Sequence, residues 1–472
     1  MYPLRPVPLA LACVLLLGAC ANAPEPGGSS DGQDQGADEV YGLAPVPEGG
    51  GGEVPDDVNG DGYADLLFLG PVETPGREGA WEQTRRLVVV YGSEHGPEPT
   101  TRTGLEAGAV TAVASVGGGQ HLRAGTADLD GDGFADIPVT TAPPSGQGIG
   151  EAAVFWGGPT GPAADEAPVP VASASSGEGE DDEWSPSGAA PAPGDFDGDG
   201  RADLVSFEES DGGSRLSVLY GPFDREGVPE RTGHRTVGAR AGDLVPAPVA
   251  EGVPTPLLVR RGDDGEQPGN TLFLTGEGDP EEWGEAELRA GGMSVFGDFD
   301  GDGETDLAVG DDGGRNNEPG YGTELPEVDD KLNVYHGPFG TDAPEPSSVS
   351  LPRDEGSYGV FRSLGGCDLD GDGADTLAVG LGGHGVDLVD DTDAGPVLSG
   401  APPLVRPAPG TGSSGGGAPA AHVFACADHN ADGSDELVLY QVPKADWSTP
   451  LRWWVTDGSE DEVAFDGAGF ED

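Results

Sequence analysis

The sequence has few positive charges. Lysine occurs only at Lys331 and Lys444, and lysine and arginine together number 22 against 86 acidic residues, which gives a formal net charge of −64. Nucleic-acid backbones and anionic lipid surfaces are bound through basic side chains, so the composition excludes both as principal partners of the folded chain. Long apolar runs are also missing after the first twenty residues, and no later stretch approaches the roughly 20 residues that a membrane helix needs.

Signals of catalysis are missing as well. The seven histidines are scattered along the chain, and no nucleophile elbow, phosphate-binding loop or zincin helix is present. Carboxylate pairs are abundant, but they occur in clusters for which metal binding is the simpler explanation. The sequence therefore predicts a protein that is not an enzyme.

Glycine and proline are abundant, with 84 and 44 residues, and this content alone is typical of a low-complexity chain. However, 35% of the residues are hydrophobic, and they occur in short β-branched runs. A core is therefore possible, and repeated tight turns explain the glycine better than disorder does.

The N-terminal segment has the features of an export signal. Arg5 is its only charge, and the apolar run from Val7 to Leu17 is too short to span a bilayer. The next residues, Leu-Gly-Ala-Cys20, resemble the lipobox of bacterial lipoproteins, in which the cysteine is acylated and becomes the mature N-terminus. The resemblance implies a signal peptide at 1–19 and a lipid anchor in the outer leaflet of a bacterial plasma membrane. The alternative is an ordinary signal peptide with an incidental cysteine.

Residues 20–52 are rich in Pro, Gly, Ser, Asp and Gln and contain few large apolar side chains. Such a segment buries too little surface to offset the entropy cost of ordering it. We expect a disordered tether between Cys20 and a folded domain at 53–472.

One nine-residue pattern, in which aspartate or asparagine recurs at positions 1, 3 and 5, occurs six times, and in five of the copies an acid stands at position 9. The copies begin at Asp57, Asp128, Asp195, Asp298, Asp368 and Asp428. Their starts are separated by 71, 67, 103, 70 and 60 residues. Inside the longest interval, residues 242–243, 257–259 and 272–274 repeat the surroundings of the pattern without its acids. We therefore count seven units of roughly 62 residues, which indicates a repeat architecture.

Each unit contains short apolar segments at corresponding places. One leads into the acidic loop (293–296), a second follows it (307–309), a third ends at a glycine (87–91), and a weaker fourth is visible in places (348–351). No long helical periodicity competes with them. Four short strands in each of seven units predict an all-β fold, a seven-bladed β-propeller, and a six-bladed propeller with one long insertion is the alternative.

The acidic loops have the chemistry of a calcium site. Four oxygen side chains within nine residues repel one another unless a cation lies between them, and calcium accepts six to eight oxygens in irregular geometry. Magnesium requires stricter geometry, and zinc prefers His and Cys ligands that the loops lack. An EF-hand would need a glutamate at position 12 and flanking helices, and neither is present.

Positions 1, 3, 5 and 9 supply side-chain oxygen, and position 7 supplies its backbone carbonyl. The predicted calcium ligands are Asp57, Asn59, Asp61, Tyr63, Asp65, Asp128, Asp130, Asp132, Phe134, Asp136, Asp195, Asp197, Asp199, Arg201, Asp203, Asp298, Asp300, Asp302, Glu304, Asp306, Asp368, Asp370, Asp372, Ala374, Asp428, Asn430, Asp432, Ser434 and Glu436. In the fifth copy Thr376 stands at position 9, and Asp375 comes one residue early. We therefore predict five or six Ca²⁺ sites, with the fifth copy weak or empty.

The repeated motif, preceded by phrases such as 294–297 (Ser-Val-Phe-Gly) and followed by Leu-Ala-Val-Gly, resembles the FG-GAP or VCBS-type repeat. This repeat builds the seven-bladed propeller of integrin α subunits and of many bacterial surface proteins. The resemblance covers roughly residues 53–472. It implies that calcium binds in a hairpin between the first and second strands of a blade.

Connections on the face opposite the acidic loops are candidates for a binding surface, because function concentrates on loops of a rigid scaffold. The long connections 71–83, 173–187 and 311–330 are predicted there, and they carry Trp81, Trp184 and Tyr321. The alternative is that these acidic loops serve solubility only.

Cys367 and Cys426 lie one or two residues before the first aspartate of neighbouring acidic loops. Equivalent positions on adjacent inner strands can be close enough for a disulfide, and an exported protein is in an oxidising compartment. We therefore predict a Cys367–Cys426 disulfide.

Taken with the resemblance, the sequence predicts a calcium-stabilised cell-surface lipoprotein that acts as a binding, adhesion or assembly module. Its ligand would be a protein or a carbohydrate at the cell surface. The alternatives are an extracellular hydrolase or lyase acting on polysaccharide or phosphate esters, and a sugar-binding lectin.

Overall fold

The structure is a computed structural model. It describes residues 43–52, 54–72, 84–105, 110–113, 125–141, 151–171, 191–210, 213–238, 241–261, 267–314, 325–342, 344–352, 362–381, 385–392, 395–400, 402–406, 421–441 and 452–466. The predicted signal peptide, Cys20 and tether residues 21–42 lie outside the described residues, as do Trp81, Trp184 and Tyr321. Within the described ranges, no helix is long and apolar enough to cross a bilayer.

The described chain is almost entirely β-structure, in seven antiparallel sheets whose strands pair in sequence order. In chain order the sheets contain β1 (Leu66–Val72), β2 (Thr84–Val90) and β3 (Arg102–Leu105) in blade 1; β4 (Val110–Val113), β5 (Ile137–Thr141), β6 (Glu151–Phe155) and β7 (Val169–Pro170) in blade 2; β8 (Ala192–Gly194), β9 (Asp203–Ser210), β10 (Gly213–Tyr220) and β11 (Arg231–Gly238) in blade 3; β12 (Ala241–Pro246), β13 (Leu257–Arg261), β14 (Gly269–Leu274) and β15 (Gly284–Leu288) in blade 4; β16 (Met293–Gly297), β17 (Asp306–Gly310), β18 (Lys331–Tyr335) and β19 (Ser347–Ser350) in blade 5; β20 (Ser363–Cys367), β21 (Thr376–Leu381), β22 (Gly385–Asp390) and β23 (Val397–Leu398) in blade 6; and β24 (His422–Ala427), β25 (Glu436–Gln441), β26 (Arg452–Thr456) and β27 (Asp461–Asp466) in blade 7. A single 3₁₀ turn, η1 (Pro280–Glu282), precedes β15.

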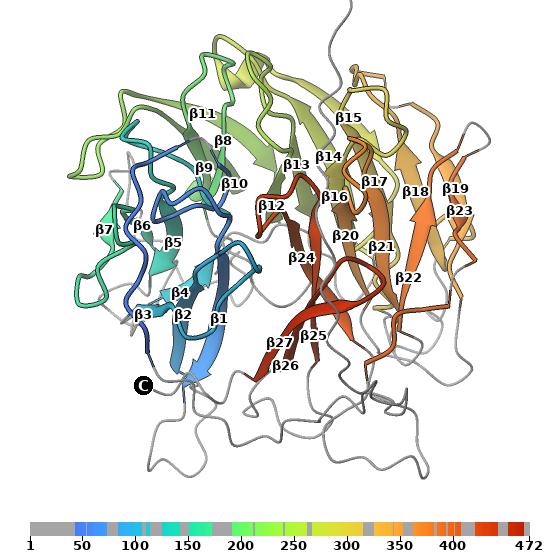
Figure 1. Ribbon diagram of the computed structural model, residues 1–472. Coiled ribbons are helices and arrows are strands. Elements are labelled where there is room, and N and C mark those ends of the chain that lie inside the picture. Colours follow the sequence, from blue (N-terminus) through green and yellow to red (C-terminus); the bar gives the residue numbers. More distant parts are fainter. Residues whose placement is uncertain are drawn as a thin grey trace, which may run out of the picture. The chain divides into compact units, whose positions relative to one another are not determined.

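The seven sheets form a β-propeller, which confirms the predicted fold class (Figure 1). The first strands β8, β12, β16, β20 and β24 contact one another in succession. A hydrophobic cluster fills the space between each pair of neighbouring blades. Each cluster has members from both blades, and one such pair from each, in ring order, is Leu67 and Ile137, Val154 and Leu204, Val218 and Leu257, Leu258 and Leu307, Leu332 and Leu377, Ala378 and Leu437, and Trp453 and Leu66. The last cluster joins blade 7 to blade 1, so the ring closes.

The central strands explain the continuous apolar runs of the sequence. All five residues of β17 are buried, with Leu307 and Val309 in the cluster shared with blade 4 and Ala308 in the cluster shared with blade 6. Successive side chains of a strand point to opposite faces, so one strand supplies two cores. Burial of a Leu or Val side chain contributes about 1.5–3 kcal/mol, so each central strand stabilises both seams.

Blade 4 is the unit that the sequence shows only weakly. Strands β12 to β14 coincide with the degenerate segments 242–243, 257–259 and 272–274. The connection between β12 and β13, residues 247–256, has one acid, Glu251. The six-bladed alternative is therefore wrong.

Blade 1 departs from the expected four strands. Its sheet has three strands in the described residues, and no strand precedes Asp57. Residues 43–52 include four consecutive glycines and two prolines, which disfavour a paired strand. This segment instead hydrogen-bonds to loops: Ala44 N–H donates to the carbonyl of Thr100 at 2.7 Å, and Gly52 N–H donates to that of Gly133 at 2.8 Å. The end of the predicted tether therefore belongs to the folded unit.

Candidate metal centres

The acidic segments are hairpin loops at one end of their blades. Each of the six copies comes directly before the second strand of its blade, and in blades 3, 5, 6 and 7 it directly joins the first strand to the second. The two strands are antiparallel neighbours, as in the pair β16 and β17. The predicted strand context of the motif is therefore correct.

The carboxylate at position 1 organises each loop. Asp128 Oδ1 accepts the backbone N–H groups of Gly131 and Asp132 at 2.8 and 3.0 Å, and Oδ2 accepts that of Gly133 at 2.8 Å. Asp57, Asp195 and Asp298 make the same three contacts, and Asp368 and Asp428 make at least the last two. These bonds bend the backbone around the carboxylates.

The carboxylate at position 9 ties the loop to the third strand. Asp136, which is fully buried, accepts Leu129 N–H at 2.9 Å and Gly157 N–H at 2.8 Å. Asp65, Asp203 and Asp306 bind a position-2 amide and a glycine amide in the same way. The glycine is required by close approach, because a Cβ on Gly157 would lie 2.4 Å from the carbonyl oxygen of Ala135. This contact explains why the third apolar segments end at or shortly before a glycine.

Burial disfavours the charged form of the position-9 carboxylates. Desolvation raises the pKa of Asp136 to about 8, that of Glu436 to about 8 and that of Asp203 to about 7, despite the backbone hydrogen bonds that lower them. Burial also raises the pKa of Asp65 well above its ordinary value. A cation beside such a group would favour its charged form.

The loops bring hard oxygen donors together. One carboxylate oxygen from each of Asp195, Asp197 and Asp199 lies within 4.8 Å of the others. Asp298, Asp300 and Asp302 form a corresponding group, and so do Asp128, Asp130 and Asp136. The position-7 residues Tyr63, Phe134, Arg201, Glu304, Ala374 and Ser434 each donate their N–H to the acid at position 5. Converging oxygen donors on a pre-bent backbone fit calcium.

The fifth and sixth copies differ from the other four at positions 8 and 9, and they differ from each other at position 9. Asp375 does not replace the missing acid at position 9, because its carboxylate accepts the N–H of Asp298 in blade 5 at 2.8 Å. Asp435 of the sixth copy makes the equivalent contact with Asp368 N–H at 3.1 Å. The sixth copy keeps an acid at position 9, Glu436, whereas the fifth copy has Thr376 there. The donor set of the fifth loop is therefore one carboxylate short.

Blade 4 holds its first connection without an acidic cluster. The hydroxyl of Thr255, which is buried, accepts Asp195 N–H at 2.9 Å, and Thr255 N–H donates to Asp195 O at 2.7 Å. Pro254 packs over Gly198 of the blade 3 loop. Direct hydrogen bonds and proline packing therefore fix this connection.

Two arginines that sequence reasoning missed reach the acidic loops. Arg225 pairs with Asp130 and Asp132 of the blade 2 loop and lies over the ring of Trp156. Arg231 pairs with Asp197 of the blade 3 loop. Each arginine lies between 30 and 100 residues along the chain from its partner, so local motif analysis does not find it. Any cation entering these two loops shares carboxylates with a guanidinium.

A histidine that sequence reasoning also left unassigned faces the blade 5 loop. His336 Nδ1 lies 3.4 Å from Asp300 Oδ2 and 3.4 Å from Asp306 Oδ2. Its position just before Gly337 corresponds to that of an aromatic residue before the glycine in blades 1 to 3. Aligning the units on that glycine would have singled it out.

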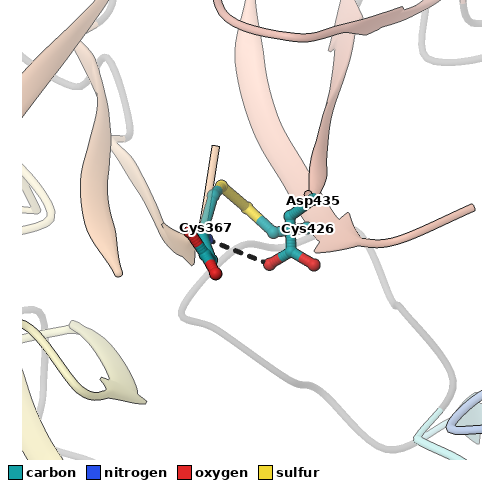
Figure 2. Close-up of a disulfide and its surroundings, with 4 residues drawn as sticks. Cys367, Cys426 and Asp435 are labelled. Atoms are coloured by element: carbon teal, nitrogen blue, oxygen red, sulfur yellow. Dashed lines mark hydrogen bonds between the residues drawn. A yellow bond between two sulfur atoms is a disulfide. The ribbon is translucent and has the colours of Figure 1, made fainter. Parts of the chain in front are cut away.

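The two predicted disulfide partners are joined. Cys367 at the end of β20 and Cys426 in β24 form a disulfide with Cα atoms 5.3 Å apart. Figure 2 shows it beside Asp435, whose carboxylate accepts the N–H of Asp368. The covalent bond and this hydrogen bond link the first strands of blades 6 and 7 next to their acidic loops.

The propeller scaffold fits a binding or assembly module. A scan against protein-family models finds no match, and a search of curated proteins finds no similar sequence either. The chain is therefore assigned by its architecture, as a seven-bladed β-propeller with acidic hairpin loops in six of its blades.

Proposed function

We propose that the protein is a calcium-stabilised binding module of the FG-GAP type, held at the bacterial cell surface by a lipid on Cys20. The observation that supports calcium is the shared geometry of the loops. In each loop a position-1 carboxylate bends the backbone, and in five loops a buried acid at position 9 faces the same turn. The role of the ions is structural, because binding to the folded state alone stabilises it by mass action.

The course of residues 43–52 distinguishes the two faces of the propeller. This segment contacts Thr100, Pro159 and Gly60, which lie on the acidic loop of blade 1 or on connections between third and fourth strands. The described chain therefore begins on the face of the acidic loops. On the opposite face β1 continues toward β2 and β17 toward β18. We propose that face as the surface that binds a protein or carbohydrate partner.

Calcium withdrawal tests the structural role. Five sites at a calcium concentration of about 100 times Kd would each contribute about 2.7 kcal/mol. We expect chelation to lower the melting temperature by at least about 10 °C, with recovery on addition of calcium but not of magnesium. Differential scanning calorimetry measures this change, and an unchanged melting temperature would contradict the proposal.

Variants of single loops make that test specific. Asp136→Asn removes a position-9 carboxylate and should lower the number of bound calcium ions by one, whereas Asp165→Asn, an exposed acid outside the loops, should not. Thr376→Asp supplies the missing acid of the fifth loop and should add a calcium ion or tighten a weak one about tenfold. Equilibrium dialysis with metal analysis counts the ions.

Partner binding is tested with the cell envelope. The full-length protein, immobilised through its C-terminus in calcium, should retain a specific protein or glycan from solubilised envelope and release it when Trp81 and Trp184 are both replaced by alanine. Equal retention by the double variant would contradict the choice of binding face.

A further inference from the structure

The blade 5 loop has a nitrogen donor in addition to its carboxylates. His336 follows β18 directly, and the next residue, Gly337, donates its N–H to Asp306 Oδ1 at 2.8 Å. This contact holds the imidazole beside the loop, with Nδ1 at 3.4 Å from both Asp300 Oδ2 and Asp306 Oδ2. One donor atom from each of the three residues lies within 4.8 Å of the other two. The arrangement is a compact set of one nitrogen and two oxygens.

The other ring nitrogen faces a buried carboxylate from the next blade. His336 Nε2 lies 3.5 Å from Oδ2 of Asp391, which follows β22 in blade 6. The Asp391 side chain is 0% exposed, and its Oδ2 atom accepts no hydrogen bond. A buried carboxylate oxygen without a donor is costly, so we infer that the imidazole carries its proton on Nε2. Nδ1 lies within hydrogen-bonding distance of Asp306 Oδ2, at 3.4 Å, so this edge of the ring holds either a second proton or a metal cation bound between Nδ1 and the two carboxylates.

This combination is typical of a metal-binding histidine. A ligating imidazole almost always donates its second ring N–H to a carboxylate or carbonyl, which fixes its tautomer and orientation. Asp391 is placed for that role.

The donor spacing accommodates zinc as well as calcium, because octahedral calcium with bonds of about 2.4 Å also has edges of about 3.4 Å, so the nitrogen donor decides between the two ions. Zinc binds nitrogen and oxygen at about 2.0–2.2 Å, and a tetrahedron with bonds of about 2.1 Å has edges of about 3.4 Å. Both measured nitrogen–oxygen distances have this length.

The other loops lack this nitrogen. Pairing of Leu307 with Tyr335 places His336 opposite Asp306, the position-9 acid. By the same register, Tyr91, Trp156 and Tyr220 stand opposite the position-9 acids of blades 1 to 3, and Asp390 and Asp457 stand at this place in blades 6 and 7. Within the described parts of the chain, only the blade 5 loop therefore has an imidazole at this place.

We propose that the blade 5 loop is a mixed nitrogen–oxygen site that selects Zn²⁺ over Ca²⁺. His336, Asp300 and Asp306 are its ligands, and Asp391 orients the imidazole. An imidazole suits zinc, whereas calcium prefers oxygen alone. The inference rests on the proposed metal binding by these loops and changes the ion expected in one of them.

The test measures zinc in the presence of calcium. The full-length protein is dialysed against millimolar calcium and micromolar zinc, and both metals are counted by mass spectrometry. The wild type should retain one zinc ion per chain. His336→Tyr, which introduces the residue type of blades 1 and 3, should lose it, and His95→Tyr, a histidine outside the loops that is 85% exposed, should keep it. Asp391→Asn keeps every ligand and should weaken zinc binding 10- to 100-fold.

A second measurement uses the wild type alone, so it does not depend on how a variant folds. Cobalt(II) added in place of zinc should give the intense visible absorption of a four-coordinate site, and stoichiometric zinc should abolish that absorption. Failure of the wild type to retain zinc, or equal retention by the wild type and His336→Tyr, would overturn the inference.

The calcium count in the same samples separates the two proposals. Calcium in the remaining loops without His336-dependent zinc would refute only the zinc site. His336-dependent zinc without calcium anywhere would support the zinc site and refute the calcium-stabilised module.

Discussion

At the scale of single residues, position 4 of the acidic loops needs a left-handed backbone. Five copies have glycine there, with φ between 69° and 76°, and the sixth has Ala431 at φ 58°. The carboxylate at position 1 bends the chain so tightly that this conformation is required whether or not the residue suits it. An L-residue pays about 1–2 kcal/mol for it.

We therefore expect Ala431→Gly to raise the free energy of unfolding by about 1 kcal/mol, because glycine adopts positive φ without a steric penalty. Denaturant unfolding at saturating calcium measures the change. Ala427→Gly, an alanine in the extended backbone of β24, serves as the control and should lower the stability. A loss of stability in Ala431→Gly would show that the loop does not impose this conformation.

The spacing of the motif was sufficient to place the acids of each hairpin, Asp128 and Asp136 among them, whereas the hydrogen bonds by which they organise the loop were not predicted and their binding of calcium stays a prediction. It was not sufficient for Asp375, which looks like a displaced position-9 acid but faces the preceding blade. Arg225 was also out of reach, because its contact with Asp130 joins two neighbouring blades and a motif describes only its own hairpin. His336 lies in the same blade as Asp300 and Asp306, and an alignment of the units would have found it.

At the scale of the hairpin, the buried acids couple metal binding to protons. The folded-state pKa values of Asp136 and Asp203, about 8 and about 7, lie above the ordinary value of 3.8. Between about pH 4 and about pH 8 the folded metal-free protein therefore binds more protons than the unfolded chain. Its stability is highest at the acidic end of this window and falls as pH rises through it.

We expect the melting temperature of the metal-free protein to fall from about pH 5 to about pH 8, and the stabilisation by added calcium to grow over the same interval. Calorimetry of desalted protein with and without calcium checks both trends. Asp136→Asn should make the first trend shallower. A metal-free protein that gains stability across this interval would contradict the assignment of buried, protonated acids.

Strand positions were predictable in most blades because a strand buried on both faces leaves a continuous apolar run, as in β17. Blade 1 was the exception. A repeat pattern predicts a first strand for every unit, but glycine-rich residues 49–52 cannot supply one, and the loops of blades 1 and 2 bind that segment instead.

At the scale of the whole molecule, stability depends on closing the ring. Every seam is a shared hydrophobic cluster, and the seam between blades 6 and 7 has a disulfide in addition. The bond joins residues 59 apart in sequence, and cross-linking a loop of that length removes about 4 kcal/mol of chain entropy from the unfolded state.

Replacing Cys367 and Cys426 together by alanine should lower the free energy of unfolding by about 2–5 kcal/mol, measured with denaturant at saturating calcium. Treatment of the wild type with a reductant in denaturant gives an independent comparison without a change of sequence. If the double variant unfolds at the denaturant concentration of the wild type, the disulfide has no role in ring stability.

In blade 4 the connection between the first and second strands is held by Thr255 and Pro254 rather than by an acidic cluster. Its junction with blade 3 should be the least sensitive to a shortage of divalent ions. When such ions run low, opening would begin elsewhere around the circle, and blades 3 and 4 would remain together as the piece from which the rest closes again.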